Sequence, residues 1–242
     1  KKMWLATPGE SHGYAYRTGL TLLEALDSRF QISISGTPPE GYSESYLRSN
    51  GTTWGDLTNP TGWIHYYGEE DWFTSSDAID RTKAGITYCN THNYNIAAFG
   101  FAWCYDPAIL SASAYLAATQ EYINHCVSNG YSTKVFFTTG PVDEDNARGE
   151  LGYKKYLLHE EIRNYVKADP SRILFDFADI LCYDDNGNRT TTTWDGNTYP
   201  IITPTNLGDA SVWHMSNAGA LRLGKAQWWM LARMAGWDGQ SQ

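Results

Sequence analysis

Short runs of β-branched and aromatic residues alternate along the chain with longer stretches in which apolar residues recur every three or four positions. Runs of the first kind predict strands, and stretches of the second kind predict helices. The predicted strands span residues 3–7, 31–35, 96–101, 134–139 and 173–177. The predicted helices span 14–26, 75–89, 111–128, a segment ending at Ala168, and a last stretch from the N-cap Ser216 to Ala235. Such alternation favours an α/β fold, a parallel sheet with helices on both faces.

Two segments interrupt this alternation. Residues 36–72 are rich in Gly, Pro, Ser, Tyr and Trp and are too long for a plain connection, so they are candidates for a site-forming loop. Residues 182–202 carry turn signals at Asn186-Gly187 and Asp195-Gly196 with a Thr-rich run between them, which predicts a β-hairpin.

The totals restrict the class of protein. The chain has 242 residues, 42% of them hydrophobic, enough for one core, so residues 1–242 are expected to form a single domain. A formal net charge of -9 is the wrong sign for binding nucleic acid or an anionic membrane surface. No apolar run approaches the roughly 20 residues that cross a bilayer. We therefore expect a soluble monomer or weak homo-oligomer.

Compartment and cysteine chemistry are less constrained. The chain enters a strand pattern almost at once, so a signal peptide, if there was one, has been removed, and a secreted or periplasmic protein is expected. Cys89, Cys104, Cys126 and Cys182 lack CxxC spacing, which disfavours a zinc site. Cys104 and Cys182 each follow a predicted strand and either approach one another or remain buried thiols. The 17 Tyr, 10 Trp and 8 Phe suit a protein that binds sugar rings on aromatic faces.

Chemistry is expected beyond the carboxyl ends of the strands, where α/β sheets bind ligands. A small-residue turn after the first strand contains Ser11 and leads directly into a helix, which suits a nucleophile because helix N–H groups point at the anion formed there. His214, just before the last helix, is the candidate base, and Asp209 is the nearest carboxylate that could orient it. Alternatively, Ser11 caps the helix and His214 is structural.

These residues carry a family resemblance. Gly9-Glu10-Ser11 resembles the Gly-Asp-Ser block of the SGNH (GDSL-like) hydrolases, and His214 stands where that family keeps its histidine. The resemblance implies a three-layer α/β/α sandwich with a flavodoxin-like five-stranded parallel sheet of order 2-1-3-4-5. It also implies Ser11 as nucleophile, His214 as general base, and the Ser11 amide with Gly41 as oxyanion donors, with no cofactor and no metal.

The sequence departs from the family pattern at three places. The family's acid lies three residues before the histidine, where this chain has Ser211, whereas Asp209 lies five before. The segment from Gly100 to Asp106 lacks the asparagine that the family uses as an oxyanion donor. Glu10 replaces a shorter acidic residue.

Other candidates for substrate binding follow the third strand or lie in the first helix. Trp103 and Asp106 are expected to face the cleft, the indole stacking on a sugar and the carboxylate accepting from its hydroxyls, unless the indole is packed in the core. Arg17 lies near the start of the first helix and is positioned for an anionic substrate group, or it pairs with a neighbouring carboxylate.

Three functions remain, in this order. The first is a carbohydrate-active serine esterase that removes acetyl or similar acyl groups from a polysaccharide or oligosaccharide. The second is cleavage of a glycosidic bond, by hydrolysis or by elimination beside a uronate, with Glu10, Asp106 or Asp209 as acid or base. The third is a glycan-binding protein without catalytic activity.

Overall fold

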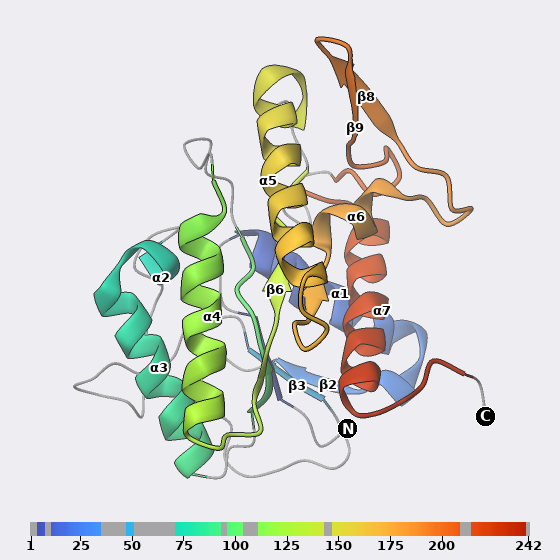
Figure 1. Ribbon diagram of the computed structural model, residues 1–242. Coiled ribbons are helices and arrows are strands. Elements are labelled where there is room, and N and C mark those ends of the chain that lie inside the picture. Colours follow the sequence, from blue (N-terminus) through green and yellow to red (C-terminus); the bar gives the residue numbers. More distant parts are fainter. Residues whose placement is uncertain are drawn as a thin grey trace.

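The computed structural model describes residues 4–7, 11–34, 47–50, 71–92, 96–103, 111–142, 147–208 and 214–240 (Figure 1). Its strands are β1 (Trp4–Ala6), β2 (Ile32–Ile34), β3 (Leu47–Asn50), β4 (Ile96–Phe99), β5 (Lys134–Val135), β6 (Phe137–Thr138), β7 (Leu174–Phe175), β8 (Thr191–Trp194) and β9 (Asn197–Pro200). Its helices are α1 (Ser11–Leu26), the 3-10 helix η1 (Ser28–Phe30), α2 (Asp71–Thr74), α3 (Ser76–Thr91), α4 (Ser113–Ser128), α5 (Gly149–Lys167), α6 (Phe177–Cys182) and α7 (Asn217–Met234).

The main sheet has the strand order β2-β3-β1-β4-β5, and all of its pairs are parallel. A second parallel pair, β6 with β7, continues it, because only Phe136 separates β5 from β6. The Phe136 N–H donates to the Phe99 carbonyl at 2.9 Å, and the Phe137 N–H donates to the Ile173 carbonyl at 2.8 Å. This one segment therefore joins both ladders.

The predicted α/β class is confirmed, but the predicted order 2-1-3-4-5 is wrong at one place. Strand β3 lies between β2 and β1, so the second predicted strand does not neighbour the first. Of its four residues Leu-Arg-Ser-Asn, only Leu47 is apolar, so the alternating pattern that reveals a strand is missing. Its place in the sheet is fixed by tertiary pairing, with Leu5 opposite Ser49.

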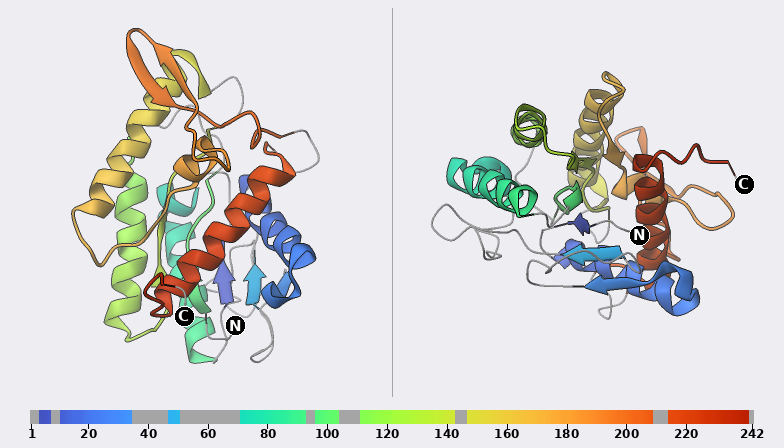
Figure 2. Two further views of the ribbon diagram at one scale, coloured as in Figure 1. Left: turned by 90° about the vertical axis from the view of Figure 1, so that its right-hand side faces the viewer. Right: turned by 90° about the horizontal axis from the view of Figure 1, so that it is seen from below.

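Side chains of the strands enter two separate cores. Trp4 and Ala6 pack with α3, α4 and α5, whereas Leu5 packs on the other face with α1, α6 and α7. Figure 2 shows these two groups of helices on opposite sides of the sheet. The predicted three-layer sandwich follows from a sheet that is apolar on both faces.

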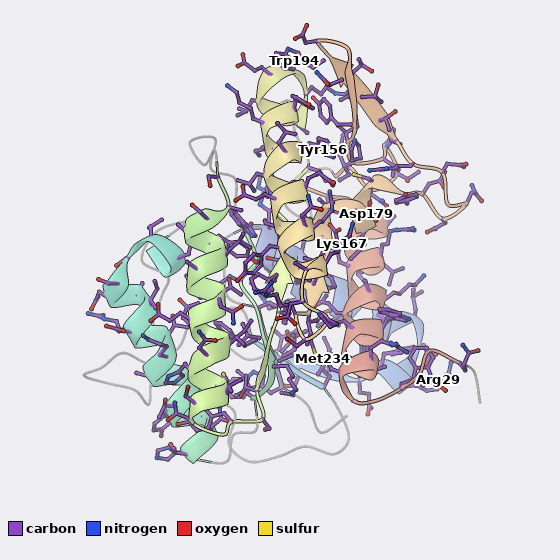
Figure 3. All side chains as sticks on the ribbon, viewed as in Figure 1. Arg29, Tyr156, Lys167, Asp179, Trp194 and Met234 are labelled. Atoms are coloured by element: carbon purple, nitrogen blue, oxygen red, sulfur yellow. The ribbon has the colours of Figure 1, made fainter. Side chains whose placement is uncertain are left out.

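The predicted hairpin is also confirmed. Strands β8 and β9 pair antiparallel, and Asp195 (φ 46°) and Gly196 (φ 76°) make the two-residue turn with the left-handed backbone that such turns require. Trp194, at the tip in Figure 3, packs against Tyr153 of α5 with ring centroids 5.7 Å apart. The hairpin therefore lies against the first half of α5.

Helices α1 and α7, from opposite ends of the sequence, lie against each other at very close range (Figure 2). A Cβ atom at Gly19 would overlap the backbone of Ala220, and one at Gly224 would overlap the backbone of Gly19. The buried Gln227 amide donates to the Tyr16 carbonyl at 2.9 Å across the contact. These two glycines permit the approach that sets the relative position of both helices.

Three of the four cysteines, Cys89, Cys126 and Cys182, are free and buried, so the pairing considered for Cys182 is not formed, and Cys104 lies outside the described residues. None of the described helices combines the length and the apolar character needed to cross a membrane.

We expect Gly19→Ala to lower the free energy of unfolding by about 1–3 kcal/mol or more, because the added methyl group must push two helix backbones apart. Urea unfolding followed by circular dichroism measures the change. Lys225→Ala is the matched control, since Lys225 is exposed and directly follows Gly224 on α7, the partner helix. Equal stability of Gly19→Ala and the wild type would contradict this account of the helix contact.

Candidate active site

The first turn of α1 lies just past the carboxyl end of β1. The helix begins at Ser11, three residues earlier than predicted, and the description of Ser11 is limited to its backbone. The first N–H groups of a helix have no partner inside it, and the positive end of its dipole points outward. This turn can therefore stabilise an anion at the edge of the sheet.

His214 lies at the same turn. The His12 ring stacks on the His214 ring with centroids 4.2 Å apart and planes 9° apart. His12 also contacts the edge of Phe177, the first residue of α6, at 6.2 Å between centroids. The residue that follows Ser11 is thus in direct contact with the imidazole from the far end of the chain. From the sequence, His12 was only one residue of the turn. Its place directly after Ser11 was the one signal that pointed to it.

The backbone around His214 is unusual and tightly held. His214 has φ 67°, a left-handed conformation that is uncommon for residues other than Gly and is often found at functional sites. Met215 pairs with Leu207 in an isolated antiparallel bridge. A Cβ atom at Gly208 would overlap the backbone of Met215, so glycine is needed where these two segments meet.

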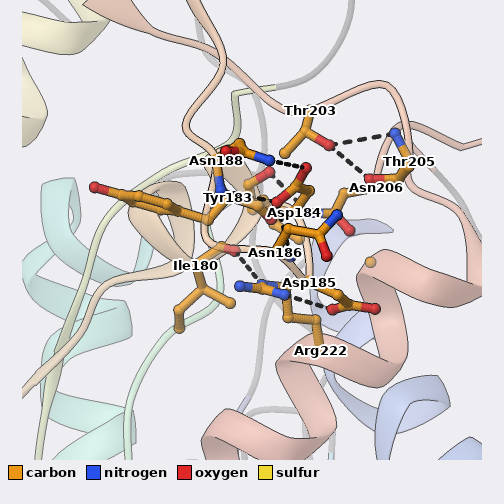
Figure 4. Close-up of polar contacts among 12 residues, drawn as sticks. Ile180, Tyr183, Asp184, Asp185, Asn186, Asn188, Thr203, Thr205, Asn206 and Arg222 are labelled. Atoms are coloured by element: carbon orange, nitrogen blue, oxygen red, sulfur yellow. Dashed lines mark hydrogen bonds and ion pairs between the residues drawn. The ribbon is translucent and has the colours of Figure 1, made fainter.

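The next contacts anchor this region to α6 and α7. Ser216 caps α7 by accepting from the Gly219 N–H at 3.1 Å, as predicted, and its hydroxyl donates to the Thr205 carbonyl at 2.6 Å. The Asn206 side chain, shown in Figure 4, donates to the carbonyls of Leu181 and Tyr183, both at 2.9 Å. The start of α7 is therefore fixed by hydrogen bonds to both neighbouring segments.

Arg222 and Asp184 complete this polar network (Figure 4). Arg222 donates to the Ile180 carbonyl at 2.9 Å and to Asp185 at 2.7 Å, which ties α7 to the end of α6. The Asp184 carboxylate accepts the N–H groups of Asn186 and Asn188, which explains the turn that the sequence predicted there.

The other predicted site residues divide into two groups. Glu10, Gly41, Asp106 and Asp209 lie outside the described residues. Trp103 is described, and the expectation that it faces the cleft is wrong. Its side chain is 5% exposed, its ring packs against Tyr115 and Phe73, and its Nε1–H donates to the Thr138 carbonyl at 3.2 Å. This indole belongs to the core and cannot stack on a ligand.

Arg17 is described and lies on α1, six residues after Ser11. Its Nη1 is buried and has no hydrogen-bond partner, and its Cζ lies 5.7 Å from the centre of the Tyr14 ring. Burial lowers the pKa of its guanidinium. The neighbouring carboxylate that would have explained it structurally is not found among the described residues.

A buried ionic network, not predicted from the sequence, links β6, β7 and α5. Arg163 donates to both Asp176 oxygens at 2.7 and 2.8 Å, and Thr139 donates to the same carboxylate at 2.8 Å. Burial alone would raise the pKa of Asp176, but its hydrogen bonds to Arg163 and that residue's charge lower it. No sequence pattern indicated this pairing, because its members lie on separate elements.

His159 lies beside this network and is a structural histidine. It is 3% exposed, and its Nε2 accepts the Gly140 N–H at 3.2 Å, which leaves the ring proton on Nδ1. Burial, with the nearby Arg163 charge, lowers the pKa of His159 to about 3. The ring is therefore neutral at physiological pH.

A cavity among the described residues lies elsewhere. It has a volume of about 780 Å³ and is lined by residues of β7 and the second half of α7, Trp229 and Met230 among them. None of its described lining residues belongs to the His12–His214 contact. Within the described part of the chain, no group of three or more His, Cys, Asp or Glu side chains could hold a metal ion.

Comparison with known proteins gives a likeness to solved structures and no family match. No protein-family model matches the sequence, and no curated protein matches it significantly. Among solved structures, the chain is similar to a Desulfitobacterium hafniense DCB-2 protein that is named for the G-D-S-L family of lipolytic proteins. The identity is 10% over 95% of this chain and 99% of that chain, with a TM-score of 0.49.

We expect the stability of the protein to fall as the pH drops from about 6.5 towards 3. In that range the unfolded chain binds a proton at His159 and the folded chain does not, so His159 contributes a slope of about 1.4 kcal/mol per pH unit. Above pH 6.5 this contribution is complete and constant. Below about pH 4, protonation of Asp176, whose pKa is lowered in the folded state, adds a further loss.

Urea unfolding at about pH 7, 5.5 and 4.5 measures this slope. His159→Gln keeps a hydrogen-bond acceptor and cannot titrate, so its slope is expected to be smaller by one proton. His92→Gln, an exposed histidine at the end of α3, is the matched control. Equal slopes for the wild type and His159→Gln would contradict the assignment.

Proposed function

We propose that this protein is a serine ester hydrolase in which Ser11 is the nucleophile and His214 the general base. The observation that carries the proposal is the stacking of His12 on His214, because it brings the beginning of α1 and the imidazole together. A serine hydroxyl is a weak nucleophile unless an adjacent base removes its proton.

The proposed reaction has two steps. In the first, the Ser11 oxygen attacks the acyl carbonyl while His214 takes the hydroxyl proton, and the collapsing intermediate expels the alcohol, which receives that proton. In the second, His214 activates a water that releases the acid from the acyl-enzyme. The negative oxygen formed in both steps would be stabilised by N–H groups of the first turn of α1 and the positive end of its dipole.

Gly41 as a second oxyanion donor and Asp209 as the carboxylate orienting His214 remain parts of the proposal. Glycosidic-bond cleavage with Glu10, Asp106 or Asp209 as acid or base remains the second candidate function. The left-handed backbone of His214 favours the hydrolase, since strain of this kind is retained where a side chain must be aimed.

We further propose an acetylated carbohydrate as the substrate. Aromatic side chains on α5 and the hairpin support this, because Tyr153, Tyr156 and Trp194 are only partly buried beyond the carboxyl edge of the sheet. Partly exposed aromatic rings offer apolar faces on which sugar rings stack.

We expect Ser11→Ala to reduce hydrolysis of 4-nitrophenyl acetate by about 10³-fold or more, and His214→Gln to do the same. Each has a matched control. Ser113→Ala changes the exposed serine that begins α4, and His92→Gln changes the exposed histidine at the C-terminal end of α3.

Release of nitrophenolate measures the rates, and circular dichroism verifies folding. Activity that survives in Ser11→Ala would overturn the nucleophile assignment. A wild type without activity on this ester and on acetylated glycans would overturn the proposed function.

His12 is proposed as a positioning residue that holds the His214 ring by stacking. We expect His12→Ala to lower kcat by about 10-fold with little change in KM, because a displaced base weakens proton transfer. His12→Phe keeps a flat ring and is expected to restore most of kcat. Failure of Phe to restore activity would show that the imidazole nitrogens of His12, and not its ring plane, are required.

A further inference from the structure

Arg17 is a partly buried cation that pairs with no carboxylate of the described residues. Its Nη1 has no hydrogen-bond partner, and no described ion pair includes its guanidinium. Its described contact is with the ring of Tyr14, a side chain that is 46% exposed. Arg163 provides the contrast, since it is also largely buried but donates twice to Asp176.

The guanidinium lies at the end of α1 where the proposed chemistry takes place. Side chains of a helix lean towards its N-terminus, which directs Arg17 back to the first turn. A Cβ atom at Gly13 would lie 3.7 Å from Arg17 Nη1 and 3.6 Å from the Thr7 carbonyl oxygen. Arg17 therefore reaches the carboxyl end of β1, beside the turn that contains Ser11 and His12.

Two further polar groups of this layer have no partner. The hydroxyls of Thr7 and Ser49 are buried without a hydrogen bond. Leu5 packs against α1 and pairs with Ser49, so alternation along β1 places Ser49 and Thr7 on the face that α1 covers. Arg17, Thr7 and Ser49 therefore each place a polar group without a hydrogen bond between α1 and the sheet.

A desolvated guanidinium without a counter-charge lowers the stability of the fold. The pKa shifts of the two arginines differ accordingly. Burial lowers the pKa of Arg17, whereas the carboxylates beside Arg163 outweigh burial and raise the pKa of Arg163. Proteins retain such a cost mainly at functional sites. An external anion would offset this cost, since no carboxylate of the described residues does so.

We propose that Arg17 binds an ionised carboxylate of the substrate, so that the preferred ester is one carried by an acidic sugar, such as a uronate. The planar guanidinium matches a carboxylate through two parallel hydrogen bonds. A single cation in a protein of net charge -9 suits a monoanion better than a dianionic phosphate. The exposed Tyr14 ring beside it offers an apolar face for the sugar. This inference rests on the proposed esterase site.

Binding is tested without catalysis. Thermal unfolding is recorded with galacturonate, galactose or galactose 6-sulfate, each at about 20 mM, where a ligand of millimolar affinity raises Tm measurably. We expect galacturonate to raise Tm of the wild type and galactose to have no effect, and Arg17→Gln to abolish the rise. Arg233→Gln, an exposed arginine at the far end of α7, is the matched control and keeps it. An equal rise with the sulfate would overturn the choice of a carboxylate.

Arg17→Met provides a second readout. Since it replaces an unpaired charge by an apolar side chain of similar length, we expect Tm without ligand to rise by about 2 °C or more. A fall in Tm would mean that the guanidinium is already paired, and would overturn the inference.

Activity separates this inference from the proposed function. The substrates are acetyl esters of methyl galacturonoside and methyl galactoside. For the wild type we expect a higher kcat/KM on the acidic ester, and for Arg17→Gln a loss of about 10- to 100-fold in that preference, mainly through KM. Hydrolysis of both esters without preference would overturn the role of Arg17 and leave the esterase intact. A rise in Tm with galacturonate, without hydrolysis of either ester, would overturn the proposed esterase function and leave the carboxylate site at Arg17.

Discussion

The close contact between α1 and α7 decides where the groups of the candidate site lie. Gly19 and Gly224 let the two helix backbones touch, and Gln227 adds a buried hydrogen bond across them. Ser11 and His12 begin one helix, and His214 lies two residues before the cap of the other. A histidine more than two hundred residues away in sequence is therefore brought to the first turn of α1. A contact made by glycine backbones resists sliding, because any shift brings side chains into the gap.

The sheet supplies the second constraint. Because the central strands β1 and β4 are apolar on both faces, helices must cover both sides, and the parallel strands direct their carboxyl ends to one edge. The network of Arg163, Asp176 and Thr139 then fixes the β6–β7 end of that edge, and His159 is kept neutral beside it. Buried charges of this kind are costly unless paired, and here the pairing is complete.

The candidate site contrasts with this well-satisfied scaffold. His214 has a left-handed backbone, and Arg17, Thr7 and Ser49 have buried polar atoms without partners. Each of these features opposes folding, and all four lie around α1 and the β1 edge. Unpaired buried polar groups and left-handed backbone are features that functional sites often share.

The sequence by itself determined the local elements. Periodicity predicted the central strands and the long helices, and the cap at Ser216 and the turn at Asp195-Gly196 were visible because their chemistry is local. The turn at Ser11 and the histidine before the last helix were also visible in the sequence, because each is a local pattern.

Only the tertiary structure decided the rest. Strand β3 has one apolar residue and exists because β1 and β2 pair with it, and Trp103 is a core residue because α2 and α4 cover it. The stacking of His12 on His214, the pairing of Arg163 with Asp176 and the isolation of Arg17 all depend on groups from distant elements. Contacts between distant elements follow from how whole faces pack, and a one-dimensional pattern does not encode which side chain meets which.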